Sequence, residues 1–139
     1  IANDDSGPVD IFVSLHLNSA ETNASGWEVF TSGSTKSKEL ANKIGYRHAE
    51  RFSSQKNRGI KQSAFYVLKF TKMPAVLWEV CFLSDDKESN WVTKDETRQE
   101  MAEAIALGVF DFFDISLRPG ESHLTLEERV TKIEKRLGI

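Results

Sequence analysis

Two ionisable side chains stand out because each interrupts an apolar segment that is typical of a β-strand. His16 comes near the end of the segment 10–17, and Glu79 breaks the apolar run 75–82. Neutral imidazole is the commonest metal ligand in proteins, although a histidine here also fits a hydrogen-bonded core position. A carboxylate in a core either pairs with a cation or takes up a proton, so Glu79 is a candidate for a salt bridge or a general base. Together the two residues predict a site more strongly than either alone.

Three other side chains are weaker candidates. Cys81 follows Glu79 by two positions, so strand alternation predicts that both face the same side, where Cys81 and His16 would form a nucleophilic pair. Buried cysteine more often behaves as a small apolar residue. We expect His48 on a helix face and His123 in a linker, neither of them as a ligand.

The charge balance excludes one class of partner. The chain has 18 basic and 21 acidic residues, a formal net charge of −3, which argues against nucleic-acid binding through phosphate contacts. One local cluster, Arg58-Gly59-Ile60-Lys61, places two cations beside a glycine in a predicted loop. Such a run is usually solvated, but it also suits contact with an anionic or carbonyl-rich substrate.

The elements that position these residues alternate between strands and amphipathic helices, which predicts a layered α/β domain. We expect strands at 10–17, 27–31, 64–70 and 75–82, helices at 37–52 and 95–113, and loops at 18–26, 55–59 and 85–90. The segment 75–82 is apolar on both faces, as a central strand would be. In the first strand one face should carry Ile11, Val13, Leu15 and Leu17, and the other Phe12, Ser14, His16 and Asn18.

The last residues differ in character from the rest. We expect a linker at 115–124 and a short helix at 125–139, in which Thr125 and Glu128 form a capping box. Its apolar residues follow the spacing of a coiled coil, and they are Leu126, Val130, Ile133 and Leu137. Two heptads are too few to be stable alone, so we expect only weak self-association through residues 125–138.

Length and composition are those of one globular domain. The chain has 139 residues, of which 40% are hydrophobic, enough for a packed core. No apolar run approaches the ~20 residues that cross a bilayer, so we expect no membrane span. The single cysteine excludes an internal disulfide.

Several segments together resemble the zinc-dependent N-acetylmuramoyl-L-alanine amidases of the Amidase 3 type, which include bacterial autolysins and phage endolysins. The matching segments occur in the family's order and at about its spacing, and they are 1–3, 10–19, 26–30, 58–61, 66–69 and 73–84. The resemblance covers residues 1–114. Many relatives have a glycine in place of Cys81.

The resemblance implies a role for each candidate residue. His16 corresponds to the last of three zinc ligands and Glu79 to the catalytic carboxylate. The loops at 18–26 and 58–61 imply substrate contacts for Asn18, Arg58 and Lys61. The other two ligands of the family, a histidine in a Gly-His-Gly-Gly turn and a glutamate, precede the segment that matches residues 1–3. We therefore expect the carboxyl-terminal two-thirds of the catalytic domain, with a sheet that is incomplete at its N-terminus.

The resemblance also implies a function. The parent enzyme would use zinc-activated water and a glutamate base to cleave the amide between N-acetylmuramic acid and L-alanine in peptidoglycan, outside the cell or in its wall. With one zinc ligand of three, the chain alone is expected to be inactive. Two alternatives stay open: a non-catalytic wall-binding or scaffold module, and a cysteine peptidase that uses Cys81 and His16.

Overall fold

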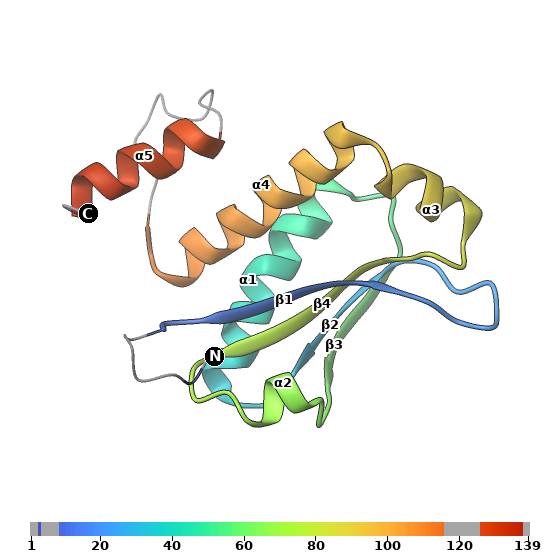
Figure 1. Ribbon diagram of the computed structural model, residues 1–139, viewed down its shortest axis with the longest axis horizontal. Coiled ribbons are helices and arrows are strands. Elements are labelled where there is room, and N and C mark those ends of the chain that lie inside the picture. Colours follow the sequence, from blue (N-terminus) through green and yellow to red (C-terminus); the bar gives the residue numbers. More distant parts are fainter. Residues whose placement is uncertain (1–2, 4–8, 116–125, 138–139) are drawn as a thin grey trace.

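A four-stranded sheet forms the centre of the computed structural model, which describes residue 3 and residues 9–115 and 126–137. The strands are β1 (Phe12–Asn18), β2 (Trp27–Thr31), β3 (Asn57–Gln62) and β4 (Ala75–Phe82), in the order β1-β4-β2-β3 (Figure 1). β1 runs parallel to β4 and β2 parallel to β3, whereas β2 and β4 are antiparallel. The prediction of a layered α/β fold is confirmed, and the sheet is mixed, because the parallel pair β1 and β4 runs antiparallel to the parallel pair β2 and β3.

The helices cover the two faces of this sheet unequally. In chain order they are α1 (Thr35–Arg51), α2 (Tyr66–Lys69), α3 (Asp86–Val92), α4 (Asp95–Phe112) and α5 (Leu126–Leu137). The long helices α1 and α4 lie on one face, and the single turn α2 lies against the other (Figure 1). None of the described helices combines the length and apolar character that a bilayer span requires. Among the described residues, the face opposite α1 and α4 is therefore the more open one.

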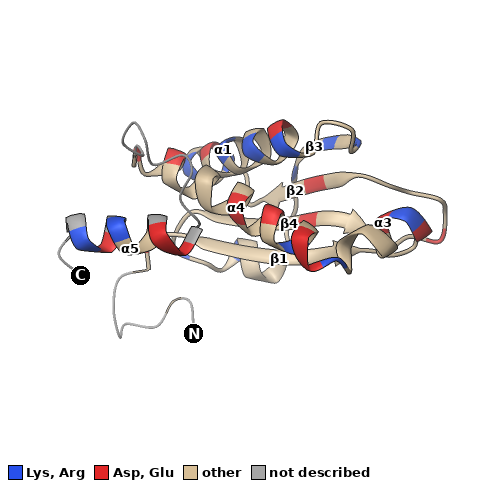
Figure 2. Ribbon diagram, turned by 90° about the horizontal axis from the view of Figure 1, so that it is seen from above, with Lys and Arg blue, Asp and Glu red and all other residues tan. Residues whose placement is uncertain are grey.

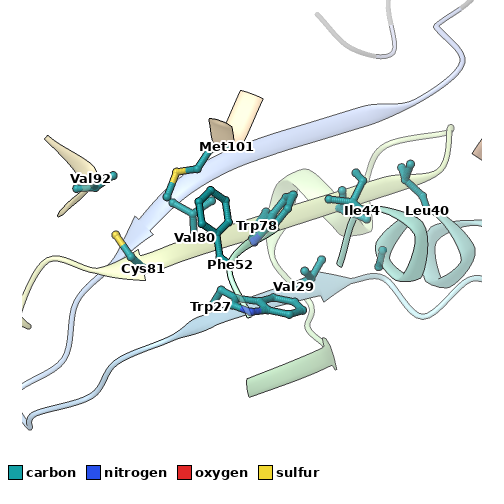
Figure 3. Packing of buried hydrophobic residues seen from close by; sticks show 12 residues of the cluster. Trp27, Val29, Leu40, Ile44, Phe52, Trp78, Val80, Cys81, Val92 and Met101 are labelled. Carbon is teal, nitrogen blue, oxygen red and sulfur yellow. The ribbon is translucent and has the colours of Figure 1, made fainter. Parts of the chain in front are cut away.

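The core follows from the alternation of side chains along β4. Trp78 and Val80 belong to the main cluster, together with Leu40 and Ile44 of α1 and Met101 of α4 (Figure 3). Val76 belongs to the same cluster, whereas Ala75 and Leu77 pack with Leu68 on the opposite face. Burial on both faces confirms that β4 is a central strand, as its continuous apolar sequence predicts. The main cluster also contains Trp27, Val29, Ala41, Phe52, Cys81 and Val92.

The two long helices pack closely because one of them carries a glycine at the crossing. A Cβ atom at Gly108 of α4 would lie 2.5 Å from the Cα of Ile44 in α1, so only glycine fits there. Arg47 of α1 donates two hydrogen bonds to Asp111 of α4, at 2.7 and 3.0 Å. These contacts fix the helical layer behind the sheet. The predicted bounds of both helices are correct to within two residues.

Residues 64–70 differ most clearly from the structure that the sequence predicts. The segment was expected to be a strand because of its aromatic and β-branched residues, but it forms the helical turn α2. A strand at this position would bury alternate residues, whereas only Leu68 is buried and Tyr66 and Phe70 are exposed. One inward-pointing leucine is enough to dock a turn, and the rest of the segment needs no partner strand.

Two further segments that were expected to be loops are regular elements. Residues 57–62 form the edge strand β3, which pairs with β2 through its backbone and whose polar side chains give no apolar alternation. Residues 86–92 form α3, for which Asp85 is the N-cap and accepts hydrogen bonds from the amides of Lys87 and Glu88. This capping signal was present in the sequence.

The C-terminal helix is confirmed as a helix, α5, within the described residues. Thr125, His123 and residues 116–124 of the predicted linker lie outside the described residues. The coiled-coil pairing of the helix stays a prediction.

Candidate active site

Three ionisable residues lie in a row across neighbouring strands. Glu79 of β4 is in register with His16 of β1 on one side and with Glu28 of β2 on the other. Because Leu77 faces α2, its alternate neighbour Glu79 lies on that same open face of the sheet. Figure 2 marks the acidic and basic positions along these strands. The two residues that the sequence singled out, His16 and Glu79, are therefore brought together.

Glu79 is half-buried and lacks the partner that a structural carboxylate needs. Among the described residues its Oε2 atom is buried and makes no hydrogen bond. Burial raises the pKa of Glu79 above its usual value, His16 opposes this rise, and the nearby charge of Glu28 adds to it. Such a carboxyl group holds a proton more readily than an exposed one, which is the property of a general base that must later act as an acid.

Glu28 is the carboxylate that forms the salt bridge considered for Glu79. It is 5% exposed, accepts a hydrogen bond from Nδ2 of Asn18 at 2.9 Å and another from Nε of Arg58 at 2.9 Å. Lys61 donates from Nζ at 2.5 Å. Burial raises the pKa of Glu28, but the hydrogen bonds from Lys61 and Arg58 outweigh it and hold the pKa below its usual value. Glu28 is therefore a charged structural anchor.

A bulge in β3 explains how two cations three positions apart reach one carboxylate. Residues separated by three positions face opposite sides of a regular strand. Here the register between β2 and β3 shifts, and Gly59 adopts φ +84°, a conformation that side chains other than glycine disfavour. The extra residue lets Arg58 and Lys61 both point to Glu28. The sequence Arg-Gly-Ile-Lys is thus a bulged strand.

His16 is exposed and has one hydrogen-bond contact in the described part of the chain, between its Nε2 atom and the Ser14 hydroxyl at 2.8 Å. Ser14 is thus in a position to orient the ring. No group of three His, Cys, Asp or Glu residues suited to a metal ion occurs among the described residues. A catalytic zinc site normally has three protein ligands, so these residues alone do not fit a complete zinc site.

The expectation that Cys81 faces the same side as Glu79 is wrong. Cys81 is fully buried in the main cluster on the helical side of the sheet, close to Val92 (Figure 3). The register between β1 and β4 shifts after His16, so alternation no longer holds at Cys81. Burial raises the pKa of this thiol to about 12. The cysteine–histidine pair is therefore absent from the described structure.

His48 lies on the inner face of α1, as expected, and is buried far from the row of ionisable residues. It packs against Trp27, Trp78 and Phe52, with its Nε2 atom 2.7 Å from Oε1 of Gln55. Burial lowers the pKa of His48 to about 4. Its neutral ring is a core side chain and a source of pH sensitivity.

The residues predicted to contact substrate converge on one point. Asn18 of β1 and both Arg58 and Lys61 of β3 donate hydrogen bonds to Glu28 of β2, so the structure brings them together from two strands. Substrate contact by these three stays a prediction. Glu28 itself was missed, although it interrupts the apolar segment 27–31 just as Glu79 interrupts 75–82. The same criterion would have found it.

The family follows from a comparison of the chain with known protein families. The model of the Amidase 3 family, described as N-acetylmuramoyl-L-alanine amidase, matches residues 1–111. The chain belongs to this family. The match includes both His16 and Glu79, together with the strands that carry Glu28, Arg58 and Lys61.

Individual relatives agree with this assignment. The chain is 31% identical to the uncharacterized protein YqiI of Bacillus subtilis, over 82% of this chain and 56% of the relative. It is 30% identical to the N-acetylmuramoyl-L-alanine amidase LytC of the same species, over 78% of this chain and 22% of the relative. A crystal structure of an N-acetylmuramoyl-L-alanine amidase from Clostridium difficile 630 superposes with a TM-score of 0.74 and 32% identity, over 81% of this chain and 61% of that one. The chain spans about half the length of the first curated relative.

Proposed function

We propose that the whole protein is a peptidoglycan hydrolase that cleaves the amide between N-acetylmuramic acid and L-alanine. The observation that carries this proposal is the pairing of His16 with Glu79, whose Oε2 atom is buried without a partner among the described residues. A carboxyl group of this kind is costly to keep in a fold unless it serves a reaction or a ligand. Membership of the amidase family supplies the class of bond.

Glu79 is the residue that moves protons in this proposal. It accepts a proton from the attacking water as the water's oxygen bonds to the amide carbonyl carbon. It then returns the proton to the leaving nitrogen of L-alanine as the carbon–nitrogen bond breaks. Its raised pKa suits both steps, because the group must hold the proton between them.

The cofactor in this proposal is Zn²⁺, with His16 as one ligand. When bound, zinc would lower the pKa of a water molecule toward ~7 and polarise a carbonyl group. Since the described residues do not form a complete donor set, the remaining ligands would come from outside them. The contact of Ser14 with His16 supports this role, because a metal-bound imidazole usually has a second group that orients it.

The substrate would lie over the open face of the sheet. We propose that Asn18, Arg58 and Lys61 border it, with Glu28 holding them in place. The side chain of Lys61 is more exposed than that of Arg58, so Lys61 is better placed to reach a carboxylate of a stem peptide. Action on peptidoglycan places the protein outside the cell or in the cell wall.

The C-terminal helix is proposed to support weak self-association through residues 125–138. Val130, which is exposed on α5, agrees with an unpaired apolar position. Sedimentation equilibrium should show a dimer only at high protein concentration, and Val130→Glu should abolish it. A monomer at every concentration would contradict this part of the proposal.

A metal-dependence experiment tests the function. The protein as its gene encodes it is incubated with purified peptidoglycan, then treated with a chelator and resupplied with Zn²⁺. We expect cleavage to stop and to return with zinc. His16→Ala should lower zinc affinity, measured by calorimetry, whereas Glu79→Gln should leave it unchanged. For the 139-residue chain alone we expect weak zinc binding and no turnover.

Other outcomes would favour the alternatives. Chelator-resistant cleavage that a thiol alkylator abolishes would indicate a cysteine peptidase, contrary to the burial of Cys81. Binding to peptidoglycan without any cleavage, with zinc present, would indicate a wall-binding or scaffold module. Robust turnover by the 139-residue chain would contradict the incomplete donor set.

A further inference from the structure

A cluster of exposed aromatic rings lies on the same face of the sheet as the candidate active site. We define the aromatic platform as Phe65, Tyr66 and Phe70, which are 41%, 77% and 53% exposed. The rings of Tyr66 and Phe70 have centroids 4.7 Å apart and are inclined by 45°. Large exposed aromatic side chains that are adjacent to one another are typical of binding surfaces.

The platform is held by a well-packed turn. Leu68 of α2 is 1% exposed and packs with Ala75 and Leu77 of β4. The amide of Phe70 donates to the carbonyl of Tyr66 at 3.1 Å, which closes the turn. A buried anchor with hydrogen-bonded neighbours fixes the backbone that carries the rings, so little backbone entropy would be lost when a ligand binds.

The platform is continuous with the row of ionisable residues. Leu77, which contacts the α2 anchor, and Glu79 lie on the same face of β4 two residues apart, about 7 Å along the strand. Phe65 also packs edge-on against Phe30 of β2, with ring centroids 5.1 Å apart. The base of the platform is therefore next to the part of the open face that carries Glu79.

Lysine side chains lie beside the aromatic rings on this face. Lys69 lies over the ring of Phe70 at 5.3 Å, and Lys61 lies over Phe30 at 5.7 Å. Lys61 is also paired with Glu28, so Lys69 is the cation beside the platform itself. Aromatic rings with a lysine beside them suit a sugar polymer that carries carboxylates.

We infer that the aromatic platform binds the glycan strand of peptidoglycan, with the apolar faces of the sugar rings stacked on Tyr66 and Phe70. The inference rests on the proposed function. The amide to be cleaved is attached to the lactyl group of N-acetylmuramic acid, so one sugar must lie beside Glu79. The aromatic platform lies on the same open face of the described structure as Glu79. The stem peptide would then extend from the sugar across the row toward His16.

A binding experiment on the 139-residue chain tests this inference without any need for hydrolysis. Co-sedimentation with insoluble peptidoglycan measures affinity for the polymer, and NMR titration with chitotetraose, a soluble N-acetylglucosamine oligomer, locates the sugar. We expect the double variant Tyr66→Ala/Phe70→Ala to bind peptidoglycan at least fivefold more weakly. Tyr66→Ala alone should weaken binding, whereas Tyr66→Trp alone should retain it, because tryptophan also stacks on sugars.

Tyr46 provides the matched control. It is an exposed tyrosine, 64% accessible, with Arg47 over its ring at 5.8 Å, but it lies on α1 on the other side of the sheet. Tyr46→Ala should leave binding unchanged. The altered rings are exposed, so the double variant should unfold at nearly the same urea concentration as the unaltered chain, which excludes misfolding as the cause of weaker binding.

Three results would overturn the inference. The double variant would bind peptidoglycan as tightly as the unaltered chain, or Tyr46→Ala would weaken binding by the same factor. In the third, the chain would co-sediment with anionic phospholipid vesicles and not with peptidoglycan. Failure of the proposed function would look different. In that case Tyr66 and Phe70 would still be needed for binding, whereas the gene-encoded protein supplied with zinc would cleave nothing.

Discussion

Removing the charge of Glu28 should destabilise the whole sheet. Glu28→Gln keeps the shape of the side chain but leaves Arg58 and Lys61 without their carboxylate. Breaking a buried pair typically costs ~3–5 kcal/mol. The two cations are 26% and 40% exposed, so solvent screens part of the loss and we expect about 2–3 kcal/mol. That is a large share of the ~5–15 kcal/mol that holds a domain together.

Urea denaturation followed by tryptophan fluorescence measures this loss, since Trp27 and Trp78 are buried. The control is Glu39→Gln, which breaks an exposed pair with Lys36 and should cost less than ~1 kcal/mol. The pKa of Glu28 lies below 4.5 in the folded state, so its contribution is complete above that pH and declines as the pH falls through the lowered value. Equal stabilities of the two variants at pH 7 would refute the anchoring role.

Three further predictions concern single residues. Burial lowers the pKa of His48 from 6.5 to about 4, so the free energy of unfolding should be highest above pH 6.5 and should fall by about 3 kcal/mol as the pH drops to 4. In urea titrations at several pH values, His48→Phe should remove this pH dependence. The same pH dependence in the variant would contradict the assignment. Gly59→Ala should cost ~1–2 kcal/mol because of its φ of +84°, although the space around it is open; no change in the denaturation midpoint would argue against the bulge. Cys81 should react with iodoacetamide at least ~100-fold more slowly in the folded chain than in urea, since its pKa is raised to about 12; fast labelling of the folded chain would show that the thiol is accessible.

The elements that could be predicted from the sequence are those whose buried positions produce a regular pattern of apolar residues. β4 is apolar on both faces and was recognised as central, and α1 and α4 have apolar residues at helical spacing. The meeting of His16 and Glu79 followed from their places in two apolar strands. The fold class was therefore accessible without coordinates.

The parts that were missed depend on backbone pairing or on register. β3 has an exposed, polar sequence and forms a strand because its backbone pairs with the backbone of β2. Cys81 does not follow the alternation of side chains along β4, because the register of β1 and β4 shifts beyond His16. The side-chain pattern of the sequence does not indicate such a shift. α2 was mistaken for a strand because aromatic residues are common in strands, whereas here they are exposed on the surface. The same exposed aromatic residues account for the wrong strand prediction and form the proposed glycan site.

The most direct test of the account is the number of new L-alanine amino termini released from purified peptidoglycan. The gene-encoded protein with zinc should produce them, and Glu79→Gln should reduce the rate ~100-fold or more while zinc binding is retained. Glu39→Gln, which alters an exposed carboxylate away from the site, should have the normal rate. Release of L-alanine termini at a near-normal rate by Glu79→Gln would contradict the assignment of Glu79 as the proton carrier.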